Sequence, residues 1–384
     1  MKQGWRSKKL GDVCEVIAGQ SPKGEYYNSD GVGLPFYQGK KEFTGKYIGL
    51  PKKWTSVTTK EALKDDVLMS VRAPVGPVNF STQRICIGRG LAAIRTGSLI
   101  NKEFLYNFLV NHENQIVGNT GAVFNSINQT QIKSIPIPVP PLEEQKQIVA
   151  KLDQCFEAID KAKANAAKNL ENAKELFQSK LNEIFSQKGE GWVEKKLGEI
   201  SDVTYGFTDK SVEVGDFRYV RITDIDNNGE LISTGKKYIG SSKDGKKFIL
   251  KDNDILMART GATFAKLLLY KDIEPSIFAS YLIKIDFTES IDNEFYWFYA
   301  KSNSYWDQAN TLSTGSAQPH FNGKALKQVL FPYPVSKTEQ SRLINEFKRF
   351  QSKTQSLESK YQQELNSLEE LKKSILQKAF EGEL

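Results

Sequence analysis

The stretch that decides the fold occurs twice in the chain. It first reads Gly4-Trp5-Arg6-Ser7-Lys8-Lys9-Leu10-Gly11-Asp12 and returns as Gly191-Trp192-Val193-Glu194-Lys195-Lys196-Leu197-Gly198-Glu199. The offset is 187 residues. A repeat of this length predicts a molecule with pseudo-two-fold symmetry, which would suit a partner that has two similar sites.

Other segments repeat in the same order. Leu63-Lys64-Asp65 returns as Leu250-Lys251-Asp252 at an offset of 187, and Asp66-Val67-Leu68-Met69 matches Asp254-Ile255-Leu256-Met257 one residue further on. Glu144-Gln145 returns as Glu339-Gln340, and Leu181 with Phe185 returns as Leu376 with Phe380, both at an offset of 195. The repeat therefore extends over almost the whole chain.

Composition narrows the class of protein. A chain of 384 residues with 39% hydrophobic and 11% aromatic residues can form two or three packed domains. Three scattered cysteines (Cys14, Cys86, Cys155) and two histidines offer no zinc cluster and fit a reducing compartment. No apolar run reaches the ~18–20 residues of a membrane span, and no hydrophobic signal follows the first residues, so we expect a soluble, cytoplasmic protein.

The charge leaves two interpretations open. The net charge is +7 and the pI is about 8.9. A mildly basic globular protein and a binder of a polyanion both fit these values, because basic residues favour nucleic acid only where they gather on one face.

Each half contains a globule followed by a long helix. Short strand-like segments broken by turn residues, with an aromatic-rich helix at residues 101–111 and again at 292–302, predict a mixed α/β globule. Proline runs at 135–141 and 330–334 must be extended. The predicted domains are residues 1–141 and 189–335 for the globules, and 142–188 and 336–384 for the helices.

The two helices are predicted to pair. Neither proline nor glycine interrupts residues 143–188 or 336–381, and some 40 helical residues span roughly 60 Å. Apolar residues recur every three or four positions, which is typical of a coiled coil. Small Ala162 and Ala166 would face large Leu357 and Tyr361 if the helices run antiparallel; an Ala-rich solvent face is the alternative. The predicted pairing residues are Leu152, Ile159, Ala162, Ala166, Leu176, Phe347, Leu357, Tyr361 and Leu368. The fold class is thus α+β: two mixed globules and two long helices in an antiparallel coiled coil, a circular repeat cut before the first globule.

The junctions between globules and helices resemble a known family. Thr120-Gly121-Ala122 with residues 132–145, repeated as 313–322 with 330–334, is similar to the end of a target-recognition domain in the specificity subunits of type I restriction-modification systems. The second junction departs slightly, with Val335-Ser336-Lys337-Thr338 in place of Pro141-Leu142-Glu143.

The resemblance implies a function and partners. In that family each globule reads one half of a split, asymmetric double-stranded DNA sequence, and the paired helices hold the globules apart. Two modification subunits dock on the protein and methylate adenine with S-adenosylmethionine, and restriction subunits, which use ATP and Mg²⁺, can join. The specificity subunit itself has no catalytic site, no cofactor and no metal.

The residues agree with a non-catalytic role. An adenine methyltransferase needs an Asn/Asp-Pro-Pro-aromatic motif, whereas Pro140-Pro141 lies between Val139 and Leu142. We find no phosphate-binding lysine loop and no histidine beside a nucleophile. Asp65-Asp66 and Asp252 with Asp254 could be metal carboxylates, but a charged turn before a strand is the better interpretation.

DNA binding requires cations for phosphates and amides, guanidinium groups or hydroxyls for base edges. Arg72 and Arg259 stand out because both copies place an arginine after the same strand, with Thr260 beside the second. A solvated surface residue is the alternative for each candidate. The predicted DNA-binding residues are Lys23, Tyr26, Tyr27, Gln38, Lys40, Lys41, Arg72, Arg89, Asn125, Lys210, Arg221, Lys236, Lys237, Arg259, Thr260, Gln318 and His320.

The competing hypothesis is a coiled-coil scaffold whose globules bind protein. Binding of DNA by the assembled complex should weaken steeply with salt, whereas a scaffold predicts a flat response.

Overall fold

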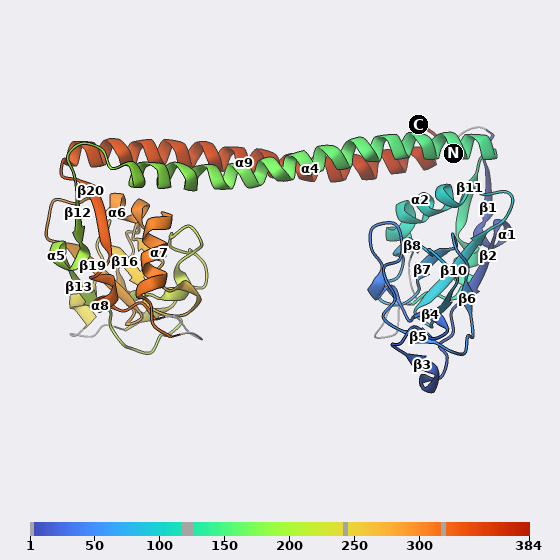
Figure 1. Ribbon diagram of the computed structural model, residues 1–384, viewed down its shortest axis with the longest axis horizontal. Helices are drawn as coiled ribbons and strands as arrows, with labels where there is room; N and C mark the ends of the chain where they lie inside the picture. Colours follow the sequence, from blue (N-terminus) through green and yellow to red (C-terminus); the bar gives the residue numbers. More distant parts are fainter. Residues whose placement is uncertain (1–3, 117–125, 241–244, 316–319) are drawn as a thin grey trace. The chain divides into compact units, whose positions relative to one another are not determined.

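The computed structural model describes residues 4–116, 126–240, 245–315 and 320–384 (Figure 1). The chain forms two compact units. Unit 1 comprises Met1–Ala166 with Gln363–Leu384, and unit 2 comprises Ala167–Gln362. Each unit thus combines one globule with a part of both long helices, so the four predicted segments assemble as two bodies. Among the described residues, no helix is both long and apolar enough to cross a bilayer.

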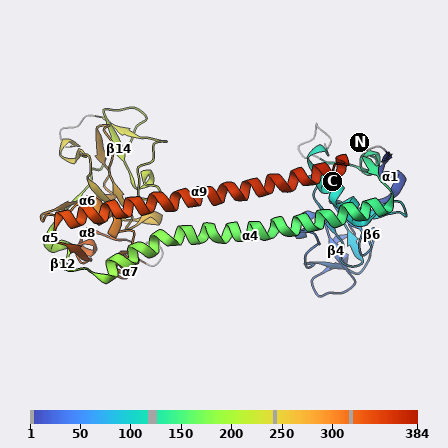
Figure 2. The same ribbon diagram turned by 90° about the horizontal axis from the view of Figure 1, so that it is seen from above.

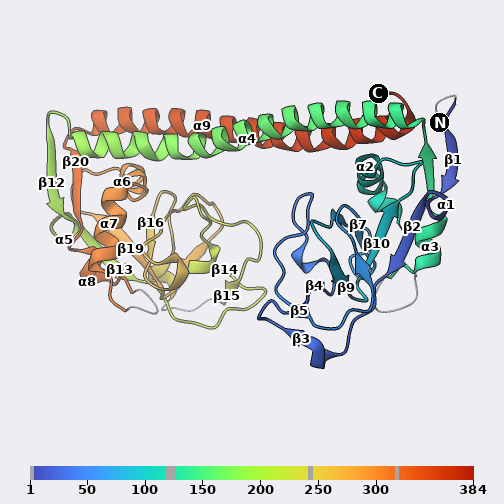
Figure 3. The ribbon, with the colours of Figure 1, turned by 45° about the vertical axis from the view of Figure 1, so that its right-hand side comes forward.

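The described residues of unit 1 form three sheets (Figure 3). An antiparallel pair joins β1 (Arg6–Lys9) and β11 (Pro136–Val139). The antiparallel main sheet has the order β2 (Cys14–Ala18), β10 (Leu91–Thr96), β7 (Val67–Ser70), β8 (Val78–Phe80). The mixed outer sheet has the order β3 (Tyr27–Asn28), β5 (Trp54–Thr55), β4 (Leu34–Tyr37), β9 (Ile85–Ile87), β6 (Glu61–Ala62). The helices of this globule are α1 (Leu10–Val13), α2 (Lys102–His112) and α3 (Gln129–Ser134).

Unit 2 repeats this plan. Its antiparallel pair is β12 (Trp192–Lys196) with β20 (Leu330–Pro334). Its main sheet has the order β13 (Ser201–Tyr205), β19 (Leu282–Phe287), β16 (Ile255–Ala258), β17 (Leu267–Leu269). Its outer sheet has three strands, β15 (Tyr238–Ile239), β14 (Phe217–Val220) and β18 (Ser276–Phe278). Its helices are α5 (Leu197–Ile200), α6 (Asn293–Tyr299), α7 (Asn303–Leu312) and α8 (Gly323–Leu326).

One predicted helix is two helices. The helix expected over residues 292–302 ends at Tyr299, and α7 begins at Asn303. The cause is Ser302, whose hydroxyl accepts a hydrogen bond from the backbone N–H of Tyr305 at 3.4 Å and so caps a new helix. The first aromatic-rich helix, α2, agrees with its prediction to one residue at each end.

The long helices are α4 (Leu142–Gln187) and α9 (Lys337–Glu381), within one residue of the predicted uninterrupted runs. In each unit their segments run antiparallel (Figure 2). In unit 1, Lys163 pairs with Glu369, and Lys372 Nζ lies 2.9 Å from Asp160 Oδ1. In unit 2, Lys180 Nζ lies 4.0 Å from a carboxylate oxygen of Glu346.

The seam differs from the prediction in two respects. Leu176 was expected in it but is 45% exposed, because Phe177 instead turns inward and packs edge-on against Phe298. The pairs Lys163–Glu369 and Asp160–Lys372 place Ala162 and Ala166 at the level of residues 366–370 rather than opposite Leu357 and Tyr361. Leu152, Ile159, Ala166 and Phe347 are buried, and Ala162, Leu357, Tyr361 and Leu368 are half-buried.

The repeated phenylalanines anchor the helices to the globules. Phe380, near the end of α9, contacts Phe104 and Phe108 of unit 1 at ring distances of 5.1 and 5.6 Å. Phe185, near the end of α4, contacts Phe295 and Tyr299 of unit 2 at 5.4 and 5.1 Å. The last turn of the chain therefore does for unit 1 what the last turn of α4 does for unit 2.

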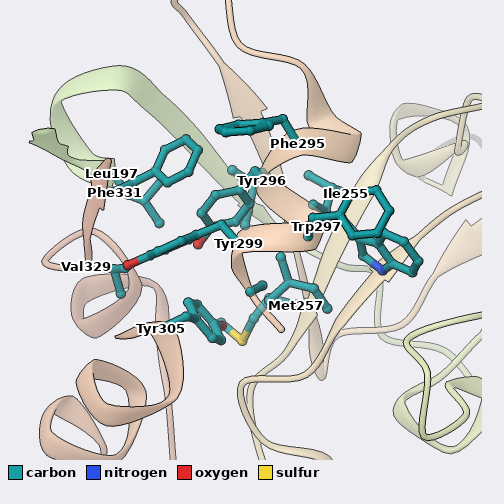
Figure 4. Packing of buried hydrophobic residues seen from close by; sticks show 14 of the residues in the cluster. Leu197, Ile255, Met257, Phe295, Tyr296, Trp297, Tyr299, Tyr305, Val329 and Phe331 are labelled. Carbon is teal, nitrogen blue, oxygen red and sulfur yellow. The ribbon is translucent and has the colours of Figure 1, made fainter. Parts of the chain in front are cut away.

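The core of unit 2 is dominated by aromatic rings. Figure 4 shows Phe295, Tyr296 and Tyr299 of α6 packing with Phe331 of β20 and with residues of β16, α5 and α7. Tyr305 is fully buried and donates its hydroxyl to the carbonyl of Ala265 at 2.6 Å. Such rings bury large apolar areas, which stabilises the platform that carries the loops.

The repeated Glu-Gln motif provides a buried clamp. Gln145 Oε1 accepts from the N–H of Asn101 at 2.7 Å, and its Nε2 donates to the carbonyls of Leu99 and Pro140 at 3.0 and 2.8 Å. Gln340 repeats all three bonds with Asp292, Ser290 and Pro334. Both glutamines are completely buried. Each clamp therefore locks the start of a long helix to the first turn of α2 or α6.

Candidate nucleic-acid interface

Both units contain a matching site at the ends of their main-sheet strands. In unit 1, Val71 donates its N–H to Gly90 O at 3.0 Å and accepts from Ile127 N–H at 3.1 Å. In unit 2, Arg259 donates to Tyr281 O at 3.0 Å and accepts from Phe321 N–H at 2.8 Å. The same backbone pattern therefore surrounds Val71 and Arg259.

A glycine allows the close approach in each copy. The N–H of Gly19 donates to Leu91 O at 2.9 Å, and that of Gly206 donates to Leu282 O at 3.1 Å. A Cβ on Gly19 would lie 2.2 Å from the carbonyl oxygen of Gly88, and one on Gly206 would lie 2.2 Å from that of Ala279. No side chain fits at either position.

The backbone pairing defines what we call the strand-end site. In unit 1 it comprises Ala18, Val71, Arg72, Arg89, Gly90 and Ser126. In unit 2 the corresponding residues are Tyr205, Arg259, Thr260, Ser280, Tyr281 and His320. The sequence suggested that Arg259 corresponds to Arg72. The backbone pairing shows that Thr260 corresponds to Arg72 and that Arg259 corresponds to Val71. None of the six pairs has the same residue in both copies.

The strand-end site of unit 1 is a small basic hollow. Arg72 and Arg89 line a cavity of about 240 Å³ together with Ser126, Asn128 and Gln129. Both arginines are exposed, and neither pairs with a carboxylate among the described residues. Two free guanidinium groups beside amide side chains can contact phosphates or base edges.

A second hollow of unit 1 is lined by lysines around an aromatic pair. Lys40, Lys41, Lys52 and Lys53 surround a cavity of about 400 Å³. At its wall Tyr27 stacks on Phe36 with 4.7 Å between ring centroids, and the ammonium of Lys53 lies 5.8 Å from the Tyr27 ring. Burial raises the pKa of Tyr27, and its hydroxyl donates to Pro22 O at 2.8 Å. None of these lysines has a carboxylate partner in the part of the chain that the structure describes.

The two hollows adjoin. Ser21 Oγ donates to Gln38 Oε1 at 2.9 Å and accepts from the N–H of Arg89 at 3.3 Å. Gln38 lines the lysine hollow and Arg89 lines the arginine hollow. The structure thus brings together most of the predicted residues of unit 1. Tyr26 belongs to the neighbouring turn η1 (Gly24–Tyr26), and Lys23, which lies 3.9 Å from Glu25, directly precedes that turn.

Lys52 and Lys53 were not identified from the sequence. Both enter the site through the pairing of β5 with β4, which brings residues 34–35 beside residues 54–55. The available signal was the basic dipeptide directly before a strand that begins at Trp54.

In unit 2 the strand-end site is aromatic. The guanidinium carbon of Arg259 lies 5.5 Å from the ring of Tyr205 and 5.2 Å from that of Tyr281. Thr260 is buried and forms a backbone bridge to the exposed His320. The structure thus brings three of the predicted residues of unit 2, Arg259, Thr260 and His320, to one strand end.

Three of the other predicted cations of unit 2 form ion pairs within the protein. Lys236 Nζ lies 2.7 Å from Glu274, Lys237 pairs with Glu213, and Arg221 lies 2.7 Å from Asp224. The ammonium of Lys236 lowers the pKa of the Glu274 carboxyl. Lys210 is exposed. Asn125 and Gln318 lie outside the described residues.

The acidic pairs considered as metal ligands hold the sheet together. Asp66 is buried and pairs with Arg95 at 2.8 Å, while Asp65 pairs with Lys102 at 3.0 Å. Asp254 repeats this arrangement with Lys284 at 3.2 Å. Among the described residues, no group of three or more side chains could hold a metal ion. These carboxylates therefore have structural partners.

Unit 2 also has a larger cavity of about 710 Å³, lined in part by Lys174, Lys266 and Trp306. Lys301 and Trp297 also line this cavity, and the ammonium of Lys301 lies 3.3 Å from the ring centroid of Trp297. Burial lowers the pKa of Lys301 to about 8. This lysine was not singled out from the sequence, because no local pattern marks it.

Comparison with known proteins identifies the family. The model of the type I restriction modification DNA specificity domain matches residues 2–169 and again residues 189–367. The chain belongs to this family and carries two such domains. It is a DNA sequence-recognition subunit and not itself an enzyme.

Relatives match in part or throughout. A protein described as the MjaX specificity subunit of a type I restriction enzyme, from Methanocaldococcus jannaschii, is 39% identical over 186 residues, which is 46% of this chain and 42% of that protein. The type I restriction enzyme StySPI specificity subunit of Salmonella potsdam is 24% identical over 100% of this chain and 90% of that protein.

Solved structures share the fold. A chain from a structure concerned with complex assembly and conformational transition of the type I R-M system has a TM-score of 0.79 at 20% identity and covers 100% of this chain and 99% of its own length. The HsdS subunit from Thermoanaerobacter tengcongensis has a TM-score of 0.65 at 19% identity, covering 100% and 98%.

Proposed function

We propose that each unit reads one half of a split, asymmetric double-stranded DNA sequence. The observation that carries this proposal is the strand-end site. Its backbone is the same in both units, whereas all six of its side-chain positions differ. A common scaffold with unlike side chains is what two unlike half-sites require, because phosphates position a protein and base edges specify the sequence.

The chemistry of unit 1 supports contacts of both kinds. The lysine hollow has the unpaired charge that phosphates attract. Arg72, Arg89 and Gln38 carry the groups that read base edges. Tyr27, Lys40 and Lys41 line the lysine hollow together with Gln38. In unit 2 we assign the same role to Arg259, Thr260 and His320, with Lys210 as a phosphate contact.

The protein then acts by placing other subunits on the DNA. We infer that two modification subunits bind it and methylate adenine with S-adenosylmethionine, and that restriction subunits using ATP and Mg²⁺ can join the complex. These cofactors belong to the partners. The complex acts in the cytoplasm, where the DNA lies.

Salt dependence of binding tests the proposal. The assembled complex is titrated with duplex DNA containing its methylation site between about 50 and 200 mM salt, and we expect affinity to fall by several orders of magnitude over that range if six or more phosphates are contacted. A flat response would contradict DNA recognition and favour a protein-binding scaffold.

A further inference from the structure

The geometry points to a base-reading side chain: we propose that Arg259, which lies beside the rings of Tyr205 and Tyr281, reads a guanine in the half-site that unit 2 recognises. This inference rests on the proposed function and deepens it by naming the base. Tyr205 and Tyr281 act as positioning residues that fix the plane of the guanidinium group.

Arg259 lies beside two aromatic rings and is hydrogen-bonded at its backbone. Its guanidinium carbon lies 5.5 Å from the Tyr205 ring and 5.2 Å from the Tyr281 ring. The Tyr205 ring is fixed in turn, because its hydroxyl accepts from the N–H of Gly323 at 2.9 Å. Stacking on aromatic faces is a preferred environment for arginine, and a guanidinium that is already oriented loses little freedom when it binds.

The guanidinium group still lacks acceptors. Nε of Arg259 is buried and has no hydrogen-bond partner among the described residues. No carboxylate of the described residues lies within ion-pair distance of this side chain. Arg221 and Arg218 differ in this respect, because they pair with Asp224 and Asp272. The charge of the Arg259 guanidinium group is therefore not neutralised by a carboxylate of the described residues, and a ligand that supplies acceptors would complete the site.

The site remains reachable from outside. Tyr205 is 41% exposed and Tyr281 is 52% exposed, and Arg259 between them is half-buried. Two partly exposed aromatic rings beside the guanidinium group leave it open to a ligand from solvent.

Comparison of the two copies favours a base over a phosphate. Both half-sites present the same phosphate backbone, so a phosphate contact at this position would be useful in both units. Unit 1 instead has Val71 at the position of Arg259, with Gly90 and Ala18 in place of the two tyrosines. A position whose chemistry differs this much carries information that differs between the half-sites. Among the bases, guanine offers the paired O6 and N7 acceptors that match the arginine fork.

The test maps methylated adenines made by the assembled complex. Arg259→Lys keeps the charge but removes the fork, so we expect one guanine position of one half-site to relax by about 10- to 100-fold, with the other half-site unchanged. Lys210→Gln is the matched control, since it removes an exposed cation of the same unit and should weaken binding to all sequences alike. If Arg259→Gln weakens all sequences equally and Arg259→Lys restores binding without changing the motif, Arg259 contacts phosphate and the inference is wrong.

A second measurement requires no variant. The unmodified complex is bound to duplexes in which each guanine in turn is replaced by 7-deazaguanine, which lacks the N7 acceptor. We expect one position to lose at least tenfold in affinity, and that loss should disappear in Arg259→Gln. A motif with no guanine in either half, or no sensitive position, overturns the inference while leaving the proposed function standing. Absence of any split motif made by the unmodified complex would instead contradict the proposed function.

Discussion

The strand-end sites of the two units have the same backbone hydrogen bonds but carry different side chains. Unit 1 presents two exposed arginines, unpaired among the described residues, next to a lysine-lined hollow, and unit 2 presents one arginine beside two tyrosine rings. Three features that support the backbone around these sites are duplicated: the strand-end glycine, the buried glutamine clamp and the docked phenylalanine. The difference teaches that the fold is conserved between the copies independently of the surface it carries.

The largest expected effect concerns the duplicated glycines. Gly19→Ala and Gly206→Ala each place a Cβ 2.2 Å from a backbone carbonyl oxygen. Because backbone cannot move aside cheaply, we expect each change to lower the free energy of unfolding by ~3–5 kcal/mol. Urea denaturation measures this. Gly24→Ala and Gly240→Ala are the controls, since nothing lies within 4 Å of either Cβ. Unequal losses at Gly19 and Gly206 would show that the scaffolds are not equivalent.

The glutamine clamps should behave alike as well. Gln145→Leu and Gln340→Leu each remove three hydrogen bonds and leave a backbone N–H without its acceptor. We expect a loss of ~2–4 kcal/mol in each unit, because buried unpaired donors are costly. Hydrogen exchange at Asn101 and Asp292 should accelerate in the corresponding variant. Gln355→Leu, an exposed position on α9, should leave both rates unchanged.

A pH dependence should distinguish the units. Burial lowers the pKa of Lys301 to about 8. The unfolded chain therefore binds more protons between pH 8 and the ordinary lysine value of about 10.5, so the free energy of unfolding rises with pH across this window. We expect the rise to amount to about 2–3 kcal/mol and to be absent in Lys301→Met. Lys301 lies nine residues after Asp292, whose N–H the glutamine clamp binds. The corresponding residue of unit 1, nine residues after Asn101, is Val110, so we expect no such titration in unit 1. A rise that persists in Lys301→Met would assign it to another group.

The smallest expected effect is a change in the salt dependence of DNA affinity, which should differ between an unpaired and a paired lysine. Lys41 is exposed and lines the lysine hollow, whereas Lys237 pairs with Glu213. If Lys41 contacts a phosphate, Lys41→Ala should reduce the slope of log affinity against log salt by about 1, and Lys237→Ala should leave it unchanged. Equal slopes for both variants would remove Lys41 from the interface.

The sequence predicted the parts of the fold that depend on local pattern. Periodic apolar residues without proline or glycine gave both long helices, and the proline runs gave β11 and β20. The duplicated motifs predicted two equivalent globules. The break at Ser302 was missed, because a single capping serine interrupted an otherwise helical pattern.

The site depends on contacts that are distant in sequence. Lys236 and Lys237 look free in the sequence, but their carboxylate partners lie 38 and 24 residues away. Arg72 and Arg259 seemed equivalent, but neighbouring residues at a strand end face opposite sides, so a shift of one residue changes the environment completely. Leu176 satisfied the helical spacing as well as Phe177 did, and only packing against Phe298 decided which side chain is buried.

The most direct test of the central claim is to map methylated adenines across the host genome with and without this gene. Two equivalent scaffolds with unlike strand-end sites predict one split motif whose halves differ in sequence, present with the gene and lost without it. Two identical halves in inverted orientation, or a methylation pattern that does not change when the gene is removed, would contradict the account.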